Sequence, residues 1–395
     1  MKAKVDVAIV GAGIIGMAAA LGLAKAGRRV ALIDMRPLPT MAPLESGIEG
    51  YDLRVSALTR RSQGLLERLG VWPHIEAARS CAYQHMDVWD DEGTGRIAFH
   101  AEDIAQQNIG HIVENKVVAA ALAEVIKDSE VQVYAPVNVL DIDNHSEGVT
   151  VTLETGSIAA DLLLGADGAL SKVRESQGYF TREWDYNHTG IVATVRMQHP
   201  HQHTAWQNFL TTGPLALLPL AEPHMVSIVW SCESSKADQL LALDDADFAQ
   251  QLTRASQGVL GKVEACSQRI GFPLRQRHAV DYVKGRVVLI GDAAHTIHPL
   301  AGQGMNLGLA DVDVLLQELQ RSVDRRLPMV HPQGLKRYQR RRKADNLAMM
   351  WTMEGFKRLF ARRELALRWL RNEGMGRLDG VADIKNHIVR HALGA

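Results

Sequence analysis

Cysteine is scarce in this chain, and long apolar runs are absent. Among 395 residues there are three cysteines, Cys81, Cys232 and Cys266, and no two of them form a CxxC pair. The sequence therefore argues against a disulfide framework or a zinc site, and we expect a cytoplasmic protein. No stretch approaches the ~18 uninterrupted apolar residues of a spanning helix. Because an apolar strand follows the first residues almost at once, we expect neither a signal peptide nor an integral anchor.

A large charge of either sign is also lacking. The formal net charge is −1, which argues against a nucleic-acid partner, because such binding needs an uncompensated basic surface. One segment departs from this balance, since residues 335–371 hold 12 Lys or Arg against 3 acids. The same segment carries Met, Trp and Phe side chains. It is either a helix that docks on the rest of the protein or one that contacts a partner or the inner membrane, where the protein would be peripheral.

The apolar pattern predicts an α/β protein. We expect more than one domain, because the chain exceeds the size at which single cores usually stop growing. Residues 4–10 have the pattern of a buried strand, 14–26 of a helix and 29–34 of a second strand, which together make one βαβ unit. Apolar strands that end in an acidic glycine turn recur at 161–168 and 286–295. We expect these strands to belong to one sheet.

Between these strands, alternating runs such as GIVATVRM and GPLALLPL indicate an inserted, mainly antiparallel sheet. From Gln303 onward the pattern is helical. We predict a discontinuous dinucleotide-binding domain (1–75, 98–180 and 272–330), a substrate domain (76–97 and 181–271) and a C-terminal helical segment (331–395).

Three glycines in the run GAGIIG predict a dinucleotide-binding turn. Gly11, Gly13 and Gly16 have the spacing that allows a tight turn, approach to a pyrophosphate and close packing of a helix on a sheet. Asp34 ends the second strand 18 residues past Gly16, where a carboxylate can accept hydrogen bonds from ribose hydroxyls. It suits the free 2′-hydroxyl of FAD or NAD equally well. The alternative is that the glycines serve only close packing.

Two further runs, GADGALSKVR at 165–174 and GDAAHTIHPLAGQGMNLG at 291–308, join GAGIIG in a pattern that resembles the aromatic hydroxylase class of FAD monooxygenases. The resemblance implies an α/β fold: an FAD-binding Rossmann-like domain of the para-hydroxybenzoate hydroxylase type, with an inserted antiparallel substrate domain and a helical C-terminus. It also implies an acid on the ribityl chain, a proline beside the reactive flavin C4a carbon, and helix amides at the flavin N1 and O2 edge. These positions are Asp292, Pro299, Gly304, Met305 and Asn306.

The same resemblance implies three more cofactor contacts, each with a structural alternative. Arg54 matches an arginine that reaches the pyrophosphate, but it has the alternative of a surface ion pair. Asn115 matches an amide near the phosphates, or it is a helix N-cap. Asp167 lies near the pyrophosphate and nicotinamide path in that class, or it caps the helix that follows its strand. His295 and His298 are interpreted as structural residues, because no nucleophile accompanies them. No metal-binding pattern is found.

Over nearly the whole chain, runs such as LRVSAL, LLERLGVW and LKRYQRRRKADN resemble the ubiquinone-biosynthesis hydroxylases. The runs ARSCAYQHMDVWDDE and GHIVEN look closest to members that act on ring carbon 5 of a polyprenylphenol. This resemblance implies hydroxylation through a flavin C4a-hydroperoxide, with O2 as cosubstrate and NAD(P)H or another electron donor. Another ring position, an FAD-dependent reductase and a non-catalytic flavin subunit are the alternatives. No acid or base is assigned.

Overall fold

A computed structural model describes residues 2–91, 93, 95–296 and 303–361, and it contains three sheets. The first sheet has the order β18-β19-β11-β1-β2-β8, with β10 beside β11 and β9 beside β10. Its strands are β1 (Lys2–Val10), β2 (Val30–Ile33), β8 (Gln132–Tyr134), β9 (Val139–Asn144), β10 (Val149–Leu153), β11 (Gly156–Gly165), β18 (Val283–Lys284) and β19 (Val287–Leu289). The central pairs β11·β1, β1·β2 and β11·β19 are parallel, as expected for a βαβ unit.

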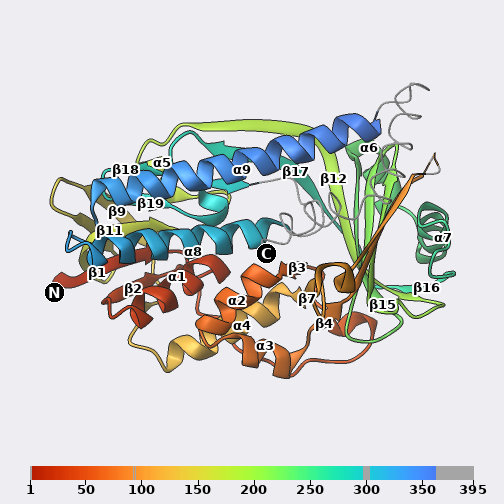
Figure 1. Cartoon of the computed structure of the whole chain (residues 1–395), viewed down its shortest axis with the longest axis horizontal. Helices are drawn as coiled ribbons and strands as arrows, with labels where there is room; N and C mark the ends of the chain where they lie inside the picture. The colour runs from red at the N-terminus through yellow and green to blue at the C-terminus, as the bar shows by residue number, and fades with distance from the viewer. Residues whose placement is uncertain (1, 92, 94, 297–302, 362–395) are drawn as a thin grey trace.

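The predicted strands and helix at the start of the chain are confirmed to within two residues at each end. Helix α1 (Ile14–Lys25) connects β1 to β2. It packs in one continuous apolar core with α4 (Asn115–Lys127) and α8 (Gln303–Asp324). In Figure 1, α8 and the long α9 (Pro332–Ala361) run side by side across this part of the molecule. The short helices here are α2 (Arg60–Arg68), α3 (Trp72–Ala78) and α5 (Lys172–Ser176).

The second sheet is mainly antiparallel and is shown at the right of Figure 1. Its order is β20-β17-β12-β15-β14-β13-β5-β6, with β16 beside β12. Its strands are β5 (His85–Asp90), β6 (Arg96–His100), β12 (Thr181–Met197), β13 (Thr204–Leu210), β14 (Gly213–Pro219), β15 (Met225–Glu233), β16 (Val263–Cys266), β17 (Ile270–Ala279) and β20 (His295–Thr296). Helices α6 (Ser234–Leu241) and α7 (Asp245–Ala255) cover one face.

The other face of the large sheet meets a small third sheet, which contains β3 (Val55–Thr59), β7 (Gly110–Glu114) and β4 (Cys81–Tyr83). Side chains of the run GPLALLPL pack on both faces of the large sheet. Leu215 and Leu217 pack beneath α6 and α7, whereas Ala216 and Leu218 pack toward the small sheet. Two-sided burial explains why this run is apolar without a polar alternation.

The strands of the large sheet do not follow the expected boundaries of the substrate segments. Within 76–97, α3 extends to Ala78 and β4 pairs with β7 of the small sheet, while β6 continues to His100. Strand β17 crosses the expected boundary at 271, because its pairing with β12 continues to Ala279. Hydrogen-bonded pairing between distant strands, which local sequence does not encode, sets these limits.

Candidate functional site

The glycine-rich turn after β1 is built on close backbone approach. Gly11 has φ +108°, and its N–H donates to the Ile33 carbonyl over 2.8 Å. A Cβ on Gly16 would lie 1.8 Å from the Gly11 carbonyl oxygen, and a Cβ on Gly11 would lie 2.3 Å from the Ala166 carbonyl oxygen. Such distances allow no side chain at either position, so close packing explains part of the glycine pattern.

Close packing does not explain Gly13. A Cβ there would meet no protein atom within 4 Å. Gly13 is the N-cap of α1, no side chain caps this end, and its first turn carries no acid. Backbone N–H groups and the positive end of the helix dipole therefore face an opening suited to a phosphate.

Asp34 and Gly13 line one pocket of about 810 Å³, together with Gly11 and Asp167. The Asp34 carboxylate accepts from the N–H groups of Ala12 (2.6 Å) and Arg36 (2.8 Å). An ionised carboxylate has about four acceptor sites, so two sites remain for ribose hydroxyls. The structure thus brings the predicted turn and the predicted ribose acceptor together.

Asp167 assists the cap of α5, whose N-cap residue is Ser171, but does not occupy the N-cap position itself. Its carboxylate accepts from the Val173 N–H of α5 over 3.1 Å, and the Ser171 hydroxyl also donates to it. Its position in the pocket wall leaves the predicted cofactor role as a proposal.

The three glycine-rich runs meet at the start of α1. Ile15 of the first run fits against Gly291 and Gly308 of the third run, where Cβ atoms would lie 3.2 and 2.7 Å from it. The Ala166 side chain of the second run would lie 3.2 Å from a Cβ on Gly16. Segments about 130 to 300 residues apart in the sequence thus lie against one another, because the glycines and Ala166 are small enough to let their backbones approach closely.

Asp292 lies in the 3-10 turn η3 (Gly291–Ala293) and is exposed. Desolvation by the surrounding protein nevertheless raises the pKa of its carboxyl group, and the charges of His295 and Arg54 act in the opposite direction. The structure therefore places Arg54 and Asp292 near each other, and Arg54 has no ion pair with another described residue.

At the start of α8, Gly304 has open space where a Cβ would lie. The Asn306 side chain makes three hydrogen bonds within the protein: it donates to the Ala57 carbonyl (2.7 Å) and accepts from the Thr59 N–H (3.0 Å) and the Ser62 hydroxyl (2.7 Å). Met305 is half-buried against the first core.

Two remaining predictions have different outcomes. Asn115 is the first residue of α4 and Glu114 takes the N-cap position, so the N-cap alternative for Asn115 is wrong. Its side-chain oxygen instead accepts from the Ser56 hydroxyl over 2.8 Å. Pro299 lies outside the described residues, as does His298.

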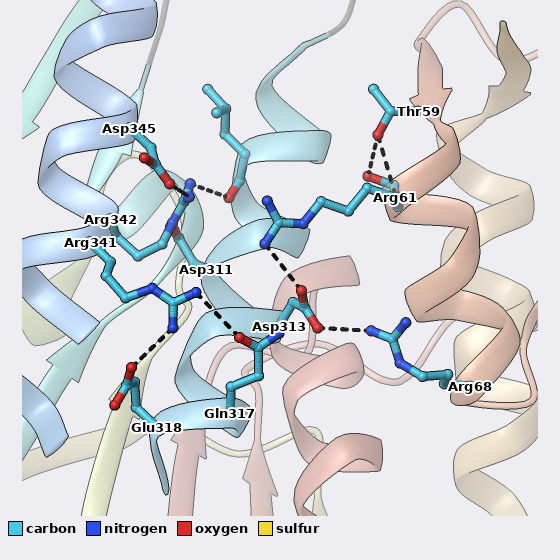
Figure 2. Close-up of polar contacts among 12 residues, drawn as sticks. Thr59, Arg61, Arg68, Asp311, Asp313, Gln317, Glu318, Arg341, Arg342 and Asp345 are labelled. Carbon is cyan, nitrogen blue, oxygen red and sulfur yellow. Dashed lines mark hydrogen bonds and ion pairs between the residues drawn. The ribbon is translucent and has the colours of Figure 1, made fainter. Parts of the chain in front are cut away.

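Sequence reasoning missed a buried acid behind this site, Asp311 on α8. A signal was present, because Leu307 and Leu315 lie four residues to either side of it on the core face of the helix. An acid on such a face needs partners. In Figure 2, Asp311 lies on α8 beside Arg342 of α9.

Replacing Asp34 with alanine should weaken FAD binding without unfolding the protein. A hydrogen bond to a charged group contributes ~1.5–3 kcal/mol, so we expect the Kd for FAD to rise roughly 10- to 150-fold. Titrating FAD into apoprotein measures this. Asp6→Ala is the matched control, because Asp6 lies on β1 away from the turn and pairs with Arg29. An unchanged Kd in the Asp34 variant would remove this residue from the site.

The chain matches the family described as FAD binding domain over residues 4–350. It is 35% identical over 392 residues to the 3-demethoxyubiquinol 3-hydroxylase of Escherichia coli (strain K12), with 98% of each chain covered. It is 32% identical over 436 residues to the Ubiquinone biosynthesis monooxygenase COQ6, mitochondrial, of Danio rerio, covering 98% of this chain and 89% of that protein.

Among solved structures, p-nitrophenol 4-monooxygenase PnpA from Pseudomonas putida DLL-E4 superposes with a TM-score of 0.77 at 18% identity, covering 98% of this chain and 97% of that one. This similarity confirms the predicted fold class. The chain belongs to the FAD binding domain family and, within it, to the FAD-dependent ring hydroxylases of ubiquinone biosynthesis.

Proposed function

We propose that the protein hydroxylates ring carbon 5 of a polyprenylated phenol, with O2 as cosubstrate and NAD(P)H or another electron donor. The observation that carries the proposal is the convergence of the three glycine-rich runs on the start of α1. When bound, FAD supplies the redox chemistry that activates O2. The chain supplies binding, orientation and exclusion of water.

Most of the predicted residues have a binding role in this proposal. The amides at Gly13 and the start of α1 bind the pyrophosphate, joined by Arg54, and Asp34 accepts from the adenosine ribose. Asp292 accepts from the ribityl hydroxyls. Backbone amides at residues 304–306 hold the electron-rich edge of the flavin, because the helix dipole favours negative charge there. Pro299 is the proposed neighbour of the reactive flavin carbon.

The proposal that the substrate carries a polyprenyl tail is supported by the relatives rather than by the composition of this chain. The apolar runs that suggest a lipid channel are accounted for by two packed cores, one on each face of the large sheet. Two relatives, by contrast, are named for ubiquinone biosynthesis or a ubiquinol substrate. We propose that the tail enters between the large sheet and the FAD-binding domain. Burial of ~0.8 kcal/mol per CH₂ would make the KM rise steeply as the tail is shortened.

The test removes the protein from a ubiquinone-making cell and identifies the quinone intermediates by mass spectrometry. We expect a polyprenylphenol that lacks the C5 hydroxyl to accumulate, and the wild-type chain, but not an Asp292→Ala chain, to restore ubiquinone. Accumulation of a later intermediate would assign the reaction to another ring position. Ring carbon 3, for which the Escherichia coli relative is named, is the main alternative. Normal ubiquinone, in a cell without a redundant hydroxylase, would contradict the proposal.

We also propose that the C-terminal half of the basic segment 335–371 contacts an anionic membrane surface. Several cations of its first half are already engaged, since Arg337 and Arg341 pair with Glu318 of α8. Lys343 donates to the Val280 carbonyl. Within the part of the chain that the structure describes, no helix is long and apolar enough to cross a bilayer.

Reversing the charges of Arg362 and Arg363 to glutamate should weaken binding to anionic vesicles in a salt-sensitive manner. Each basic residue near such a surface contributes ~1 kcal/mol. A sedimentation assay with vesicles measures the bound fraction. The control reverses Arg325 and Arg326, an adjacent exposed pair outside the segment. Equal vesicle binding by wild type and the Arg362/Arg363 variant would defeat the membrane proposal.

A further inference from the structure

Asp311 on α8 receives three hydrogen bonds in the interior of the protein. Its carboxylate, 0% exposed, accepts from the Gly291 N–H (2.9 Å), from His295 Nε2 (2.6 Å) and from Arg342 Nε (2.6 Å). Burial alone would raise the pKa of Asp311, but His295 and Arg342 outweigh it and hold the pKa below its usual value. Asp311 is therefore ionised, and it fixes the first residue of η3, the turn that carries Asp292.

Arg342 is among the largest fully buried side chains in the described part of the protein. Besides Asp311, its guanidinium donates to Asp345 (2.8 Å), to Asn346 (2.8 Å) and to the Leu307 carbonyl (3.3 Å). Figure 2 shows Arg342 directed from α9 toward α8, between Asp345 and Asp311. A buried guanidinium with every partner on α8 or α9 joins the two helices at the level of η3.

The contacts continue from Arg342 around to the other side of η3. Asn346 donates to the Tyr282 hydroxyl (3.1 Å), which lies 2.9 Å from His278 Nε2. Burial lowers the pKa of His278 to about 4, so its ring is neutral near pH 7. His278 is in turn the cross-strand partner of His295. Hydrogen bonds thus run from Asp311 through Arg342, Asn346 and Tyr282 to His278, and backbone pairing places His278 beside His295, the other side-chain partner of Asp311.

Helix α9 also holds the strand that leads into η3. The Tyr338 hydroxyl donates to the Leu289 carbonyl over 3.0 Å, two residues before Gly291. The Gln339 side-chain oxygen accepts from the N–H groups of Tyr282 (2.8 Å) and Val283 (3.0 Å). Tyr338 and Gln339 of α9 therefore contact the segment that leads into Asp292.

We propose that Arg342 is a positioning residue for cofactor binding: through Asp311 it holds η3, and hence Asp292, in the geometry that receives FAD. The inference rests on the proposed role of Asp292. If Arg342 is removed, Asp311 is left as a buried charge with one partner fewer, and such a charge forces the surrounding backbone to rearrange or to admit water. The Gly291 N–H is the backbone group that Asp311 touches directly.

The protein contains a matched control one residue away. Arg341 is also on α9 and also pairs with an acid of α8, Glu318, over 3.0 Å, but it is 44% exposed and has no described contact with η3. Arg342→Met and Arg341→Met each remove one cation between the same two helices. Any effect of Arg342→Met beyond that of Arg341→Met therefore reports on η3 rather than on general helix docking.

The experiment titrates FAD into full-length apoprotein and follows flavin fluorescence and the visible absorption of the bound flavin. Circular dichroism at the same temperature shows whether each variant is folded. We expect Arg342→Met to raise the Kd for FAD about tenfold or more and to alter the bound-flavin spectrum, and Arg341→Met to leave both near wild type. Adding Asp311→Asn to Arg342→Met removes the unpaired buried charge and should recover part of the affinity.

If Arg342→Met fails to fold, Arg342→Lys replaces it, because lysine keeps the charge but cannot reproduce the four guanidinium contacts. A raised Kd in that folded variant would support the proposal. Equal FAD affinity in Arg342→Lys or Arg342→Met and wild type would overturn it, as would equal losses in the Arg341 and Arg342 variants. A wild-type apoprotein that binds no FAD would instead overturn the proposed function.

Discussion

Replacing Gly16 with alanine should destabilise the apoprotein severely and abolish FAD binding. The new Cβ would lie 1.8 Å from the carbonyl oxygen of Gly11 in the turn before α1, and because that oxygen is a backbone atom, no side-chain rotation can relieve the clash. Overpacking a core costs ~1–3 kcal/mol, and we expect about 3 kcal/mol or more because the clash is with backbone. Thermal unfolding of the apoprotein and an FAD titration measure the two effects.

Gly13→Ala is the matched comparison, because it adds the same methyl group three residues earlier. A Cβ at Gly13 meets no protein atom within 4 Å, and its φ of −73° and ψ of 179° suit alanine. We expect apoprotein stability within ~1 kcal/mol of wild type. The methyl group would occupy the space proposed for the pyrophosphate, so FAD affinity should fall by ~100-fold. Loss of affinity in Gly16→Ala alone would mean that the opening at Gly13 binds nothing.

This contrast shows how far the sequence predicts the site. The run GAGIIG predicts a tight turn and an approach to phosphate, and the spacing is local, so strand, turn and helix follow from neighbouring residues. The sequence does not separate the glycines that pack from the glycine that opens to the pocket. That distinction depends in part on Ala166, which follows β11 and lies 150 residues after Gly16.

Features set by distant partners were predicted less well. Asn115 is a favourable N-cap by type, yet the helix begins at Asn115 itself. Glu114, at the N-cap position, holds the Arg79 guanidinium (2.6 and 2.9 Å) and the Asp52 N–H (2.6 Å). Arg342 lies within a run of basic residues, and the run itself does not indicate the buried acid on α8 that distinguishes Arg342 from its neighbours.

Replacing Asp292 with asparagine should have opposite effects on apoprotein stability and FAD affinity. Desolvation raises the pKa of this carboxyl group in the folded protein, so the native state binds its proton more tightly than the unfolded chain does. The ionised form therefore lowers stability at pH values above that pKa, and the penalty disappears as pH falls and the group is protonated in both states. The Asn variant should be more stable than wild type near pH 7, with a gain that shrinks as the pH falls through the raised pKa toward about pH 4, near the ordinary value of 3.8.

FAD affinity should fall in the same variant, because a neutral amide replaces the charged acceptor proposed for the ribityl hydroxyls. A hydrogen bond to a charged group contributes ~1.5–3 kcal/mol, so the Kd should rise roughly 10- to 150-fold, at least as much as in Asp34→Ala.

Asp313→Asn is the control, since Asp313 pairs with Arg61 (3.1 Å) and Arg68 (2.8 Å) (Figure 2) and its loss should lower stability and spare FAD binding. Thermal unfolding with and without FAD at both pH values measures both effects. A carboxylate that lowers the stability of the folded apoprotein but raises its affinity for FAD is retained for binding. An Asp292→Asn protein that is less stable than wild type near pH 7 and binds FAD normally would show instead that the carboxylate serves the fold.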